Sequence, residues 1–290
     1  MADDDGRSTR IRLRRSWQAG RVQARRTGGR PRVLPSLLII GTQRGGTTSL
    51  YEYLSRHPDV VPPLGKELQY FSVEHQRGEA WYRAHFPTQR EVERRRQRGA
   101  DCLVFEASPY YLFHPHAARR AAATVPGAKL IALLRDPVER AYSHYAHTRQ
   151  RGLEPLSFED AVAAEPERLA GEVERMQADP TYQSRAHRIW SYVSRGRYAP
   201  QLAEWLAHFP RPQLLVLRSE DLFADPGAVY GRVLDFLGLR PHALAAYPAY
   251  TRRQAGPPLG ADTRADLREE FRPDVERLTA IVGAPMSWHD

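Results

Sequence analysis

Cysteine is almost absent from this chain, because Cys102 is the only one among its 290 residues. A single cysteine excludes a disulfide within the chain and a metal site built from several cysteines. Such usage is typical of proteins kept in a reducing compartment. We therefore expect a cytoplasmic protein in which Cys102 is a small buried residue beside a strand.

Long apolar runs are missing too. The chain has no stretch of 18 consecutive apolar residues, so we expect no membrane-spanning helix. The N-terminus lacks the apolar segment of a secretory signal peptide, and no internal repeat or long low-complexity linker follows it. With 41% hydrophobic residues, the chain is nevertheless long enough to bury one substantial core.

Excess positive charge is scarce outside the N-terminus. Residues 1–33 contain ten arginines against three aspartates, which is +7 of the net charge of +9 and leaves only +2 for the rest. We interpret residues 1–33 as a basic arm, disordered or loosely helical, and residues 34–290 as one folded domain. The charge of the arm permits contact with nucleic acid or a membrane, but a solvated tail is at least as good an interpretation.

The most informative segment that is present is Leu37–Leu50, with the sequence LLIIGTQRGGTTSL. An apolar run typical of a strand ends at a glycine, a glycine-rich turn follows, and a helix is predicted to begin at the threonines. This succession directs backbone N–H groups and a helix N-terminus at one anion. The segment therefore predicts a phosphate-binding loop.

The loop departs from the nucleoside-triphosphate pattern Gly-x-x-x-x-Gly-Lys-Ser/Thr at one position. Thr47 stands where that pattern has lysine, and the basic side chain lies three residues earlier, at Arg44. A phosphate-binding loop that has lost its lysine favours a different transferable group.

Strand-like and helix-like segments alternate along the chain. Strands are predicted at Leu37–Gly41, Cys102–Phe105, Lys129–Leu134 and Gln213–Leu217. Helical periodicity is found at Thr47–Arg56, His116–Thr124, Val138–Arg149, Ala199–His208, Ala228–Leu237 and Arg264–Ile281. The alternation predicts a three-layer α/β fold of the P-loop type, with a mainly parallel central sheet and helices on both faces. Ligands of such sheets bind beyond the carboxyl ends of the strands, where the glycine loop is expected.

A second anion-binding signal follows the third predicted strand. Asp136 and Pro137 are typical N-cap and first-turn residues of a helix. Arg135 ends the strand and Ser143 lies about two helical turns further on, so the two could hold a second phosphate. The alternative is a surface arginine paired with its own helix, and on this segment alone that is the better interpretation.

The segment Gly65–Phe71, with the sequence GKELQYF, carries a third signal. Adjacent Lys66 and Glu67 would ordinarily be an exposed pair of no consequence. Here they precede Tyr70 and Phe71, an apolar anchor that could pin the segment over the edge of the sheet. A carboxylate held beside a transferable group is a candidate general base, and the neighbouring ammonium is a candidate charge stabiliser.

Taken in this order, the three segments resemble those of the sulfotransferases that use 3′-phosphoadenosine 5′-phosphosulfate (PAPS). The likeness is to the heparan-sulfate N- and 3-O-sulfotransferase domains and their bacterial relatives, and it runs from about Leu37 to Trp288. Weaker landmarks are Ala80–Pro87, Glu106–Tyr111 and Leu202–Pro210. The resemblance implies PAPS as co-substrate and a small-molecule or glycan acceptor that offers a hydroxyl or an amine.

The resemblance also implies the residues of the donor site. The 5′-phosphosulfate loop would consist of Gln43, Arg44, Gly45, Gly46, Thr47, Thr48 and Ser49. Arg135 and Ser143 would bind the 3′-phosphate. Arg252 and Arg253 would close over the nucleotide phosphates, where the family has a disulfide-braced Lys-Gly-Arg loop.

By the same resemblance, Glu67 is the catalytic base that takes a proton from the acceptor as it attacks sulfur in line. Arg44 stands where the family usually has lysine and would reach the bridging and sulfuryl oxygens, with Lys66 sharing this role. Gln69 would orient the acceptor. Ala107 replaces an active-site lysine of the relatives, so one expected cation is absent.

No metal is expected in this site. Sulfuryl transfer moves a less charged group than phosphoryl transfer, so a Mg²⁺ clamp is less necessary. The pairs His114/His116 and His144/His147 have spacings that could ligate a metal, but no carboxylate or cysteine set completes either pair. Solvated or hydrogen-bonded histidines are the better interpretation.

Two other functions stay open at this point. One is a nucleotide kinase or hydrolase with a degenerate phosphate loop, which would require Mg²⁺ and would not select a 3′,5′-bisphosphate. The other is a nucleotide-sensing binding protein whose basic arm engages nucleic acid or a membrane. Deletion of residues 1–33 separates these functions, because an enzyme should keep its donor-site affinity, whereas an arm-driven binder should lose its salt-sensitive partner binding.

Overall fold

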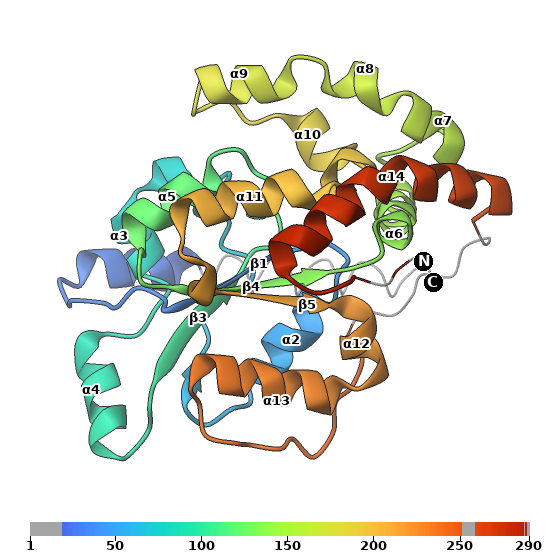
Figure 1. The fold of residues 1–290 in the computed structure, drawn as a ribbon. Coiled ribbons are helices and arrows are strands. Elements are labelled where there is room, and N and C mark those ends of the chain that lie inside the picture. Colours follow the sequence, from blue (N-terminus) through green and yellow to red (C-terminus); the bar gives the residue numbers. More distant parts are fainter. Residues whose placement is uncertain (1–18, 251–258, 287, 289–290) are drawn as a thin grey trace, which may run out of the picture.

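The computed structural model describes residues 19–250, 259–286 and 288, and at its centre lies an all-parallel sheet of five strands (Figure 1). The strand order is β2-β3-β1-β4-β5. The strands are β1 (Leu37–Gly41), β2 (Val60–Val61), β3 (Leu103–Ala107), β4 (Lys129–Leu134) and β5 (Leu214–Arg218). The predicted parallel sheet is confirmed.

The central strand β1 is apolar along its whole length because both of its faces are covered. Leu38 and Ile40 belong to one hydrophobic cluster, whereas Leu37 and Ile39 belong to another. Successive side chains of a strand point to opposite faces, so the two clusters lie on opposite sides of the sheet. Burial on both sides explains why the strand reads as a continuous apolar run.

Helices cover both faces, as predicted (Figure 1). On the side of Leu38 lie α5 (Ala117–Thr124), α11 (Tyr198–His208) and α14 (Ala261–Val282). On the side of Leu37 lie α2 (Thr47–Leu54), α12 (Ser219–Ala224) and α13 (Pro226–Leu237). The protein therefore has the three layers expected of its fold class.

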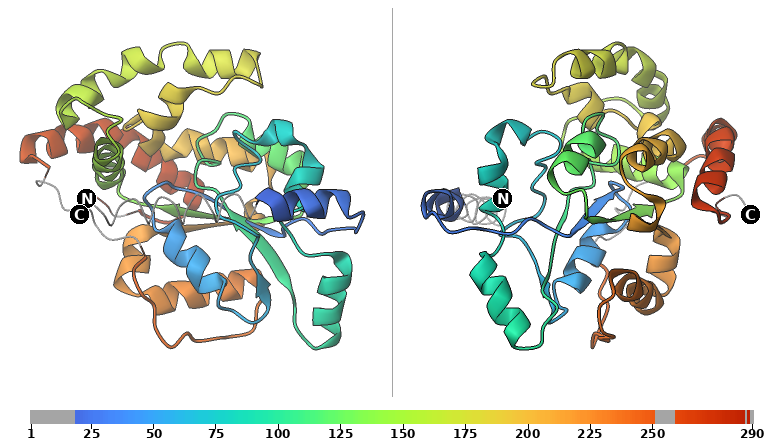
Figure 2. Two further views of the ribbon diagram at one scale, coloured as in Figure 1. Left: turned by 180° about the vertical axis from the view of Figure 1, so that it is seen from behind. Right: turned by 60° about the vertical axis from the view of Figure 1, so that its left-hand side comes forward.

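A further group of helices packs on the layer of α11 and α14, with α7 to α10 above it and α6 beside α14 (Figures 1 and 2). It consists of α6 (Pro137–Gln150), α7 (Phe158–Ala163), α8 (Glu165–Leu169), α9 (Glu172–Ala178) and α10 (Arg185–Ile189). A third hydrophobic cluster joins Val138 of α6 and Phe158 of α7 to Phe271 of α14. Buried Glu165 accepts the N–H groups of Val193 and Ser194 at 2.7 and 2.8 Å, which fixes the 3-10 turn η2 (Ser194–Gly196).

The structure differs from the predicted elements mainly at their ends. The strand expected from Cys102 begins at Leu103, because Cys102 has a φ of 48° in the left-handed region; the residue is buried, as predicted. The strand expected from Gln213 begins one residue later, because Gln213 closes a 3-10 turn. The short elements β2 and α3 (Glu79–Arg83) were not predicted, since they span too few residues to show a period. The helix α4 (Gln89–Gln97) was not predicted because Val92 is its only buried residue, which leaves no apolar face to recognise.

The second half of the predicted basic arm packs against the domain. Residues 19–27 are helical, and Val22 is buried in the same cluster as Trp81 of α3. Arg25 Nη1 donates a hydrogen bond to the carbonyl of Ala84 at 3.4 Å. Residues 1–18 lie outside the described part of the chain, and the domain boundary at residue 33 stays a prediction. Among the described residues, no helix combines the length and the apolar character needed to cross a membrane.

Candidate active site

The glycine loop between β1 and α2 lies at the carboxyl edge of the sheet. Its backbone is held from two sides: the Thr42 N–H donates to the carbonyl of Leu133 at 2.7 Å, and the Ser219 hydroxyl donates to the carbonyl of Gly45 at 2.7 Å. A Cβ on Gly45 would lie 2.7 Å from that same Leu133 oxygen. Gly46 has a φ of 89°, which favours glycine. The loop can therefore keep this shape only with its glycines.

The N-terminus of α2 offers unpaired donors to an anion. The N-cap residue is Gly46, which has no side chain that could cap the helix. Thr47, Thr48 and Ser49 therefore form an uncapped first turn. The first N–H groups of a helix have no partner within it and carry a partial positive charge. The predicted loop thus has the build of an anion cradle.

A cavity of about 380 Å³ adjoins the loop and is called the donor cavity below. Arg44, Ser49, Arg135 and Ser143 line it, so the structure brings the first two predicted anion-binding segments together. Arg44 Nε donates to Ser143 Oγ at 2.9 Å, and Arg135 Nη1 donates to the carbonyl of Arg44 at 3.3 Å. Burial, and then the charge of Arg135, lower the pKa of Arg44. Two guanidinium groups at one cavity favour an anionic ligand.

Arg135 is placed by the start of α6. Asp136 is the predicted N-cap and accepts the N–H groups of Val138 and Glu139 at 2.8 and 3.2 Å, with Pro137 in the first turn. Arg135 Nη2 also lies 3.7 Å from the carboxylate of Glu139. Arg135 therefore both pairs with its own helix and lines the donor cavity, so the two interpretations of this residue do not exclude each other.

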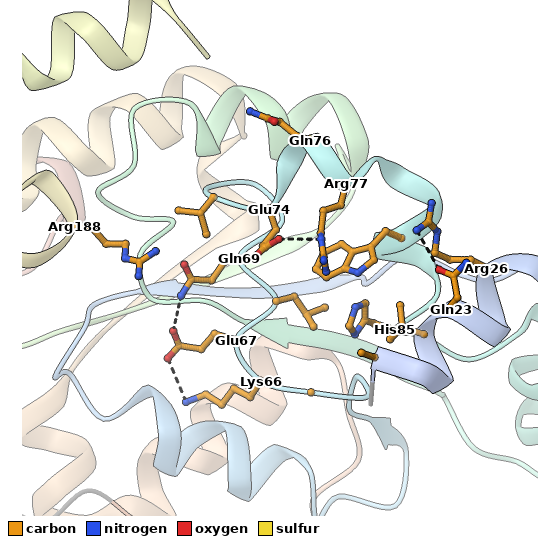
Figure 3. A pocket seen from close by; sticks show the side chains of 16 residues that line it. Gln23, Arg26, Lys66, Glu67, Gln69, Glu74, Gln76, Arg77, His85 and Arg188 are labelled. Carbon is orange, nitrogen blue, oxygen red and sulfur yellow. Dashed lines mark hydrogen bonds and ion pairs between the residues drawn. The ribbon is translucent and has the colours of Figure 1, made fainter. Parts of the chain in front are cut away.

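Lys66, Glu67 and Gln69 form a row that starts at the glycine loop (Figure 3). Lys66 Nζ donates to Thr48 Oγ1 at 2.7 Å and lies 4.0 Å from Glu67 Oε1. Gln69 Nε2 donates to Glu67 Oε2 at 3.2 Å. Burial lowers the pKa of Lys66. The predicted base is thus next to a cation that also touches the loop.

The two predicted basic residues take different places. The Arg44 guanidinium lies with Ser143 in the donor cavity, whereas the Lys66 ammonium reaches Thr48 beside Glu67. A point charge on a flexible stem and a planar fork are not interchangeable at such positions. The catalytic roles of Arg44 and Lys66 stay predictions, and this geometry favours Lys66 as the cation beside the reacting atoms.

The segment that carries Glu67 is anchored on a buried carboxylate. Glu106 of β3 accepts hydrogen bonds from the hydroxyls of Tyr82 at 2.7 Å, Tyr111 at 2.8 Å and Ser108 at 3.0 Å. Ser108 Oγ in turn accepts the Gln69 N–H at 3.0 Å. Burial raises the pKa of Glu106 to about 7, although the hydrogen bonds from the three hydroxyls lower it in part. Glu106 was not predicted as a site residue, although a lone carboxylate in an apolar strand is the signal that could have identified it.

The predicted apolar anchor completes this attachment. Tyr70 and Phe71 are both buried in the cluster on the α5 side of the sheet, and the Tyr70 ring stacks on Tyr82 with centroids 4.3 Å apart. The Phe71 N–H donates to the hydroxyl of Tyr111 at 3.3 Å. The residues after Glu67 are therefore fixed by both apolar and polar contacts.

A polar cavity of about 280 Å³ also reaches Glu67 and contains Arg195. Arg195 is buried; it donates to the side-chain oxygen of Gln43 and, at 3.0 Å, to the carbonyls of His187 and Arg188. Burial lowers its pKa to about 9. Arg195 was not predicted, because its contact with the loop depends on residues 152 positions apart in the chain.

A third cavity, of about 1030 Å³, extends from Lys66 and Glu67 to the helical residues 19–27 (Figure 3). It shares Glu67, Gln69 and Arg188 with the Arg195 cavity, so the two adjoin at the predicted base. We call this third cavity the groove. The predicted Gln69 thus lines the groove, and its acceptor-orienting role stays a prediction.

The remaining predictions concern the C-terminal loop and metals. Arg252 and Arg253 lie outside the described residues, but Tyr247 and Ala249, shortly before them, line the donor cavity. Within the described ranges, no three histidine, cysteine, aspartate or glutamate side chains gather in a way that could hold a metal ion.

Comparison with known proteins identifies a family and relatives that this chain resembles. A family model described as "Sulfotransferase domain" matches residues 34–251. The mouse heparan sulfate glucosamine 3-O-sulfotransferase 3A1 is 30% identical over 282 residues, covering 88% of this chain and 64% of the mouse protein. The human bifunctional heparan sulfate N-deacetylase/N-sulfotransferase 3 is 34% identical over 218 residues, covering 72% of this chain and 23% of its own length. The chain thus spans less than two thirds of these two relatives.

A solved structure extends the likeness to three dimensions. The crystal structure of a sulfotransferase from Alicyclobacillus acidocaldarius superposes with a TM-score of 0.65 and 31% identity, and the match covers 88% of this chain and 98% of that one. The family model alone matches well over half of the chain. This chain therefore belongs to the sulfotransferase domain family.

Proposed function

We propose that this protein transfers a sulfuryl group from PAPS to a hydroxyl or amine of a carbohydrate. The observation that carries the proposal is the row from the glycine loop through Lys66 to Glu67, which connects an anion cradle to a carboxylate at the mouth of a groove. The carbohydrate acceptor is supported by the named substrates of the heparan sulfate relatives.

The residues of the glycine loop and of the donor cavity suit the binding of PAPS. The α2 N-terminus and the loop, where Gly45 has no room for a side chain, suit the close approach of a phosphosulfate. Arg135 and Ser143 in the donor cavity suit a second phosphate, which distinguishes a 3′,5′-bisphosphate from ordinary adenine nucleotides. When bound, PAPS supplies an activated sulfuryl group whose S–O bond to the bisphosphate breaks as the bond to the acceptor forms.

The roles of the protein follow from geometry and charge. Glu67, partly exposed to the groove, takes the proton of the attacking hydroxyl or amine. Lys66, hydrogen-bonded to Thr48, places positive charge where negative charge develops on the leaving side. Gln69 holds one carboxylate oxygen of Glu67 and leaves the other to accept the proton. The Glu106 network keeps this segment in register with the loop.

Donor recognition is tested by isothermal titration with adenosine 3′,5′-bisphosphate and with ADP, each with and without Mg²⁺. We expect the bisphosphate to bind at least about ten-fold more tightly than ADP, with no requirement for Mg²⁺, because two arginines converge on the donor cavity. Tighter, Mg²⁺-dependent binding of ADP would instead support a kinase or hydrolase.

The base is tested by Glu67→Gln, which removes the proton acceptor but keeps the shape of the side chain. Transfer to a heparan sulfate oligosaccharide should fall by at least about 1,000-fold, while bisphosphate affinity stays within about two-fold. Glu79→Gln, on an exposed residue of α3 paired with Arg83, is the matched control. A Glu67→Gln variant that kept most of its turnover would show that Glu67 is not the base.

A further inference from the structure

The groove is much larger than the donor cavity and is as large as the most spacious small-molecule sites. It measures about 1030 Å³, against about 380 Å³ for the donor cavity. Small-molecule sites typically measure about 300–1,000 Å³, so the groove has room for an extended ligand. In Figure 3, Glu67 lies near Arg188 at one end, whereas Arg26 and Gln23 lie at the other. A ligand that reacts at Glu67 and fills the groove must reach residues 19–27.

Residues 19–27 are held firmly enough to serve as a wall. Val22 is only 4% exposed and packs in the cluster that contains Trp81. Arg25 donates to the Ala84 carbonyl, and burial lowers the pKa of its guanidinium. The carbonyl of Arg32, just after the helix, accepts a hydrogen bond from Arg83 Nη1 at 2.8 Å. The helix is thus attached to α3 and the residue after it through Val22 and Arg25, and the chain that follows the helix is attached through Arg32.

The charges that line the groove favour an anionic ligand. Four cations face two carboxylates: Arg26, Lys66, Arg77 and Arg188 against Glu67 and Glu74. Arg77 lies 3.2 Å from Glu74, and Lys66 lies 4.0 Å from Glu67. Arg26 Nη1 donates a hydrogen bond to the neutral side chain of Gln23 at 3.4 Å. The positive charge in excess therefore lies at the two ends of the groove.

His85 adds a neutral polar group to the middle of the groove. Its side chain is buried against Trp81, and within the described part of the chain neither ring nitrogen has a hydrogen-bond partner. Burial, and then Arg25 and Arg77, lower its pKa to about 4, so the imidazole is neutral near pH 7. Because both ring nitrogens are buried, His85 contributes packing against Trp81 to the wall of the groove and no charge.

We propose that residues 19–27 form the outer wall of the acceptor site, and that Arg26 binds an acidic group of an extended carbohydrate at a distance from the hydroxyl or amine that reacts. The wall lies outside the family match, which begins at residue 34. The proposal rests on the proposed function, and it assigns to part of the basic arm a role in choosing the acceptor.

The test compares Arg26→Glu with Arg30→Glu in the full chain. Both make the same change of charge in the same segment, but exposed Arg30 does not line the groove. Binding of an N-sulfated heparan hexasaccharide and of fully N-acetylated, neutral chitohexaose is titrated at saturating adenosine 3′,5′-bisphosphate. We expect Arg26→Glu to weaken hexasaccharide binding by about ten-fold, the equivalent of one charge-assisted hydrogen bond, and to leave chitohexaose within about two-fold. Arg30→Glu should change neither.

Other outcomes overturn the proposal in distinguishable ways. Equal losses in Arg26→Glu and Arg30→Glu would mean that the arm attracts polyanions without forming a wall. If the native chain bound the bisphosphate but preferred neither oligosaccharide, the groove would not select an anionic glycan, and the donor assignment would stand. If the bisphosphate itself did not bind, the proposed function would fail instead.

Discussion

The donor cavity and the groove are connected through Lys66, which lines the groove and donates a hydrogen bond to Thr48, next to Ser49 of the donor cavity. The two are built in different ways. The donor side depends on the backbone of one contiguous loop, clamped by Leu133 and Ser219, and on two arginines at the ends of neighbouring elements. The groove is assembled from segments far apart in the chain, and its floor is fixed by the buried Glu106 network. The difference teaches that the glycine loop has its shape mainly from its own short sequence, whereas the groove exists only through the packing of distant segments.

The largest effect that separates the two sides should come from Gly45→Ala. The new Cβ would lie 2.7 Å from the Leu133 carbonyl oxygen, a backbone atom that cannot move aside easily. We expect the affinity for adenosine 3′,5′-bisphosphate to fall by at least about 100-fold, or ~3 kcal/mol, measured by isothermal titration. Gly127→Ala is the control, because nothing lies within 4 Å of a Cβ there. Bisphosphate affinity within three-fold of the native chain would show that the loop adapts.

The buried Glu106, which anchors the segment that carries Glu67, should make the stability of the protein depend on pH. Burial raises the pKa of Glu106 from 4.5 to about 7, so the folded state keeps a proton that the unfolded chain releases. Between about pH 5 and pH 7 the free energy of unfolding should therefore fall as pH rises, by up to about 3 kcal/mol from this group. Glu106→Gln removes the titration.

Urea unfolding at about pH 5, 6.5 and 8 measures this contribution of Glu106 to the free energy of unfolding. The stability of Glu106→Gln relative to the native chain should improve steadily with pH, while the exposed Glu79→Gln control shows no such trend. A difference that is the same at every pH would mean that Glu106 is ionised throughout, stabilised by its three hydroxyl donors.

A smaller effect is expected on donor selectivity. Arg135→Ala removes one guanidinium from the donor cavity and its hydrogen bond to the Arg44 carbonyl, while the contacts of the loop with Leu133 and Ser219 remain. Affinity for the 3′,5′-bisphosphate should fall by about 10- to 100-fold, whereas affinity for adenosine 5′-phosphate should change by less than about three-fold. Arg90→Ala, on exposed α4, is the control. Equal losses for both nucleotides would mean that Arg135 orders the cavity without reading the 3′-phosphate.

The smallest effect should come from loosening the wall of the groove. Val22→Ala shortens the side chain that packs residues 19–27 on the domain, at a cost of about 1 kcal/mol or more. Binding of the heparan hexasaccharide should weaken by about two- to five-fold, with bisphosphate affinity unchanged, and the exposed Thr27→Ala should have no effect. A loss of bisphosphate affinity would show that the two sides are not independent.

Particular residues show which features of the site could be predicted from the sequence and which could not. The loop at Gln43–Ser49, the N-cap at Asp136 and the anchor at Tyr70 and Phe71 all follow from local patterns, and the structure has each of them in place. Arg195 and its contact with Gln43 carry no local signal, because buried Glu165 of a distant helix fixes the turn that presents Arg195.

By itself, the sequence determined the parallel α/β layers, the anion-binding loop and the order of the site segments, because glycine conformations, helix caps and apolar runs act between near neighbours. Only the tertiary structure decided that Lys66 contacts Glu67 and the loop while Arg44 faces the donor cavity, and that residues 19–27 border the groove. Such pairings join atoms across tens of residues, as between Arg25 and Ala84, and depend on how the whole core packs.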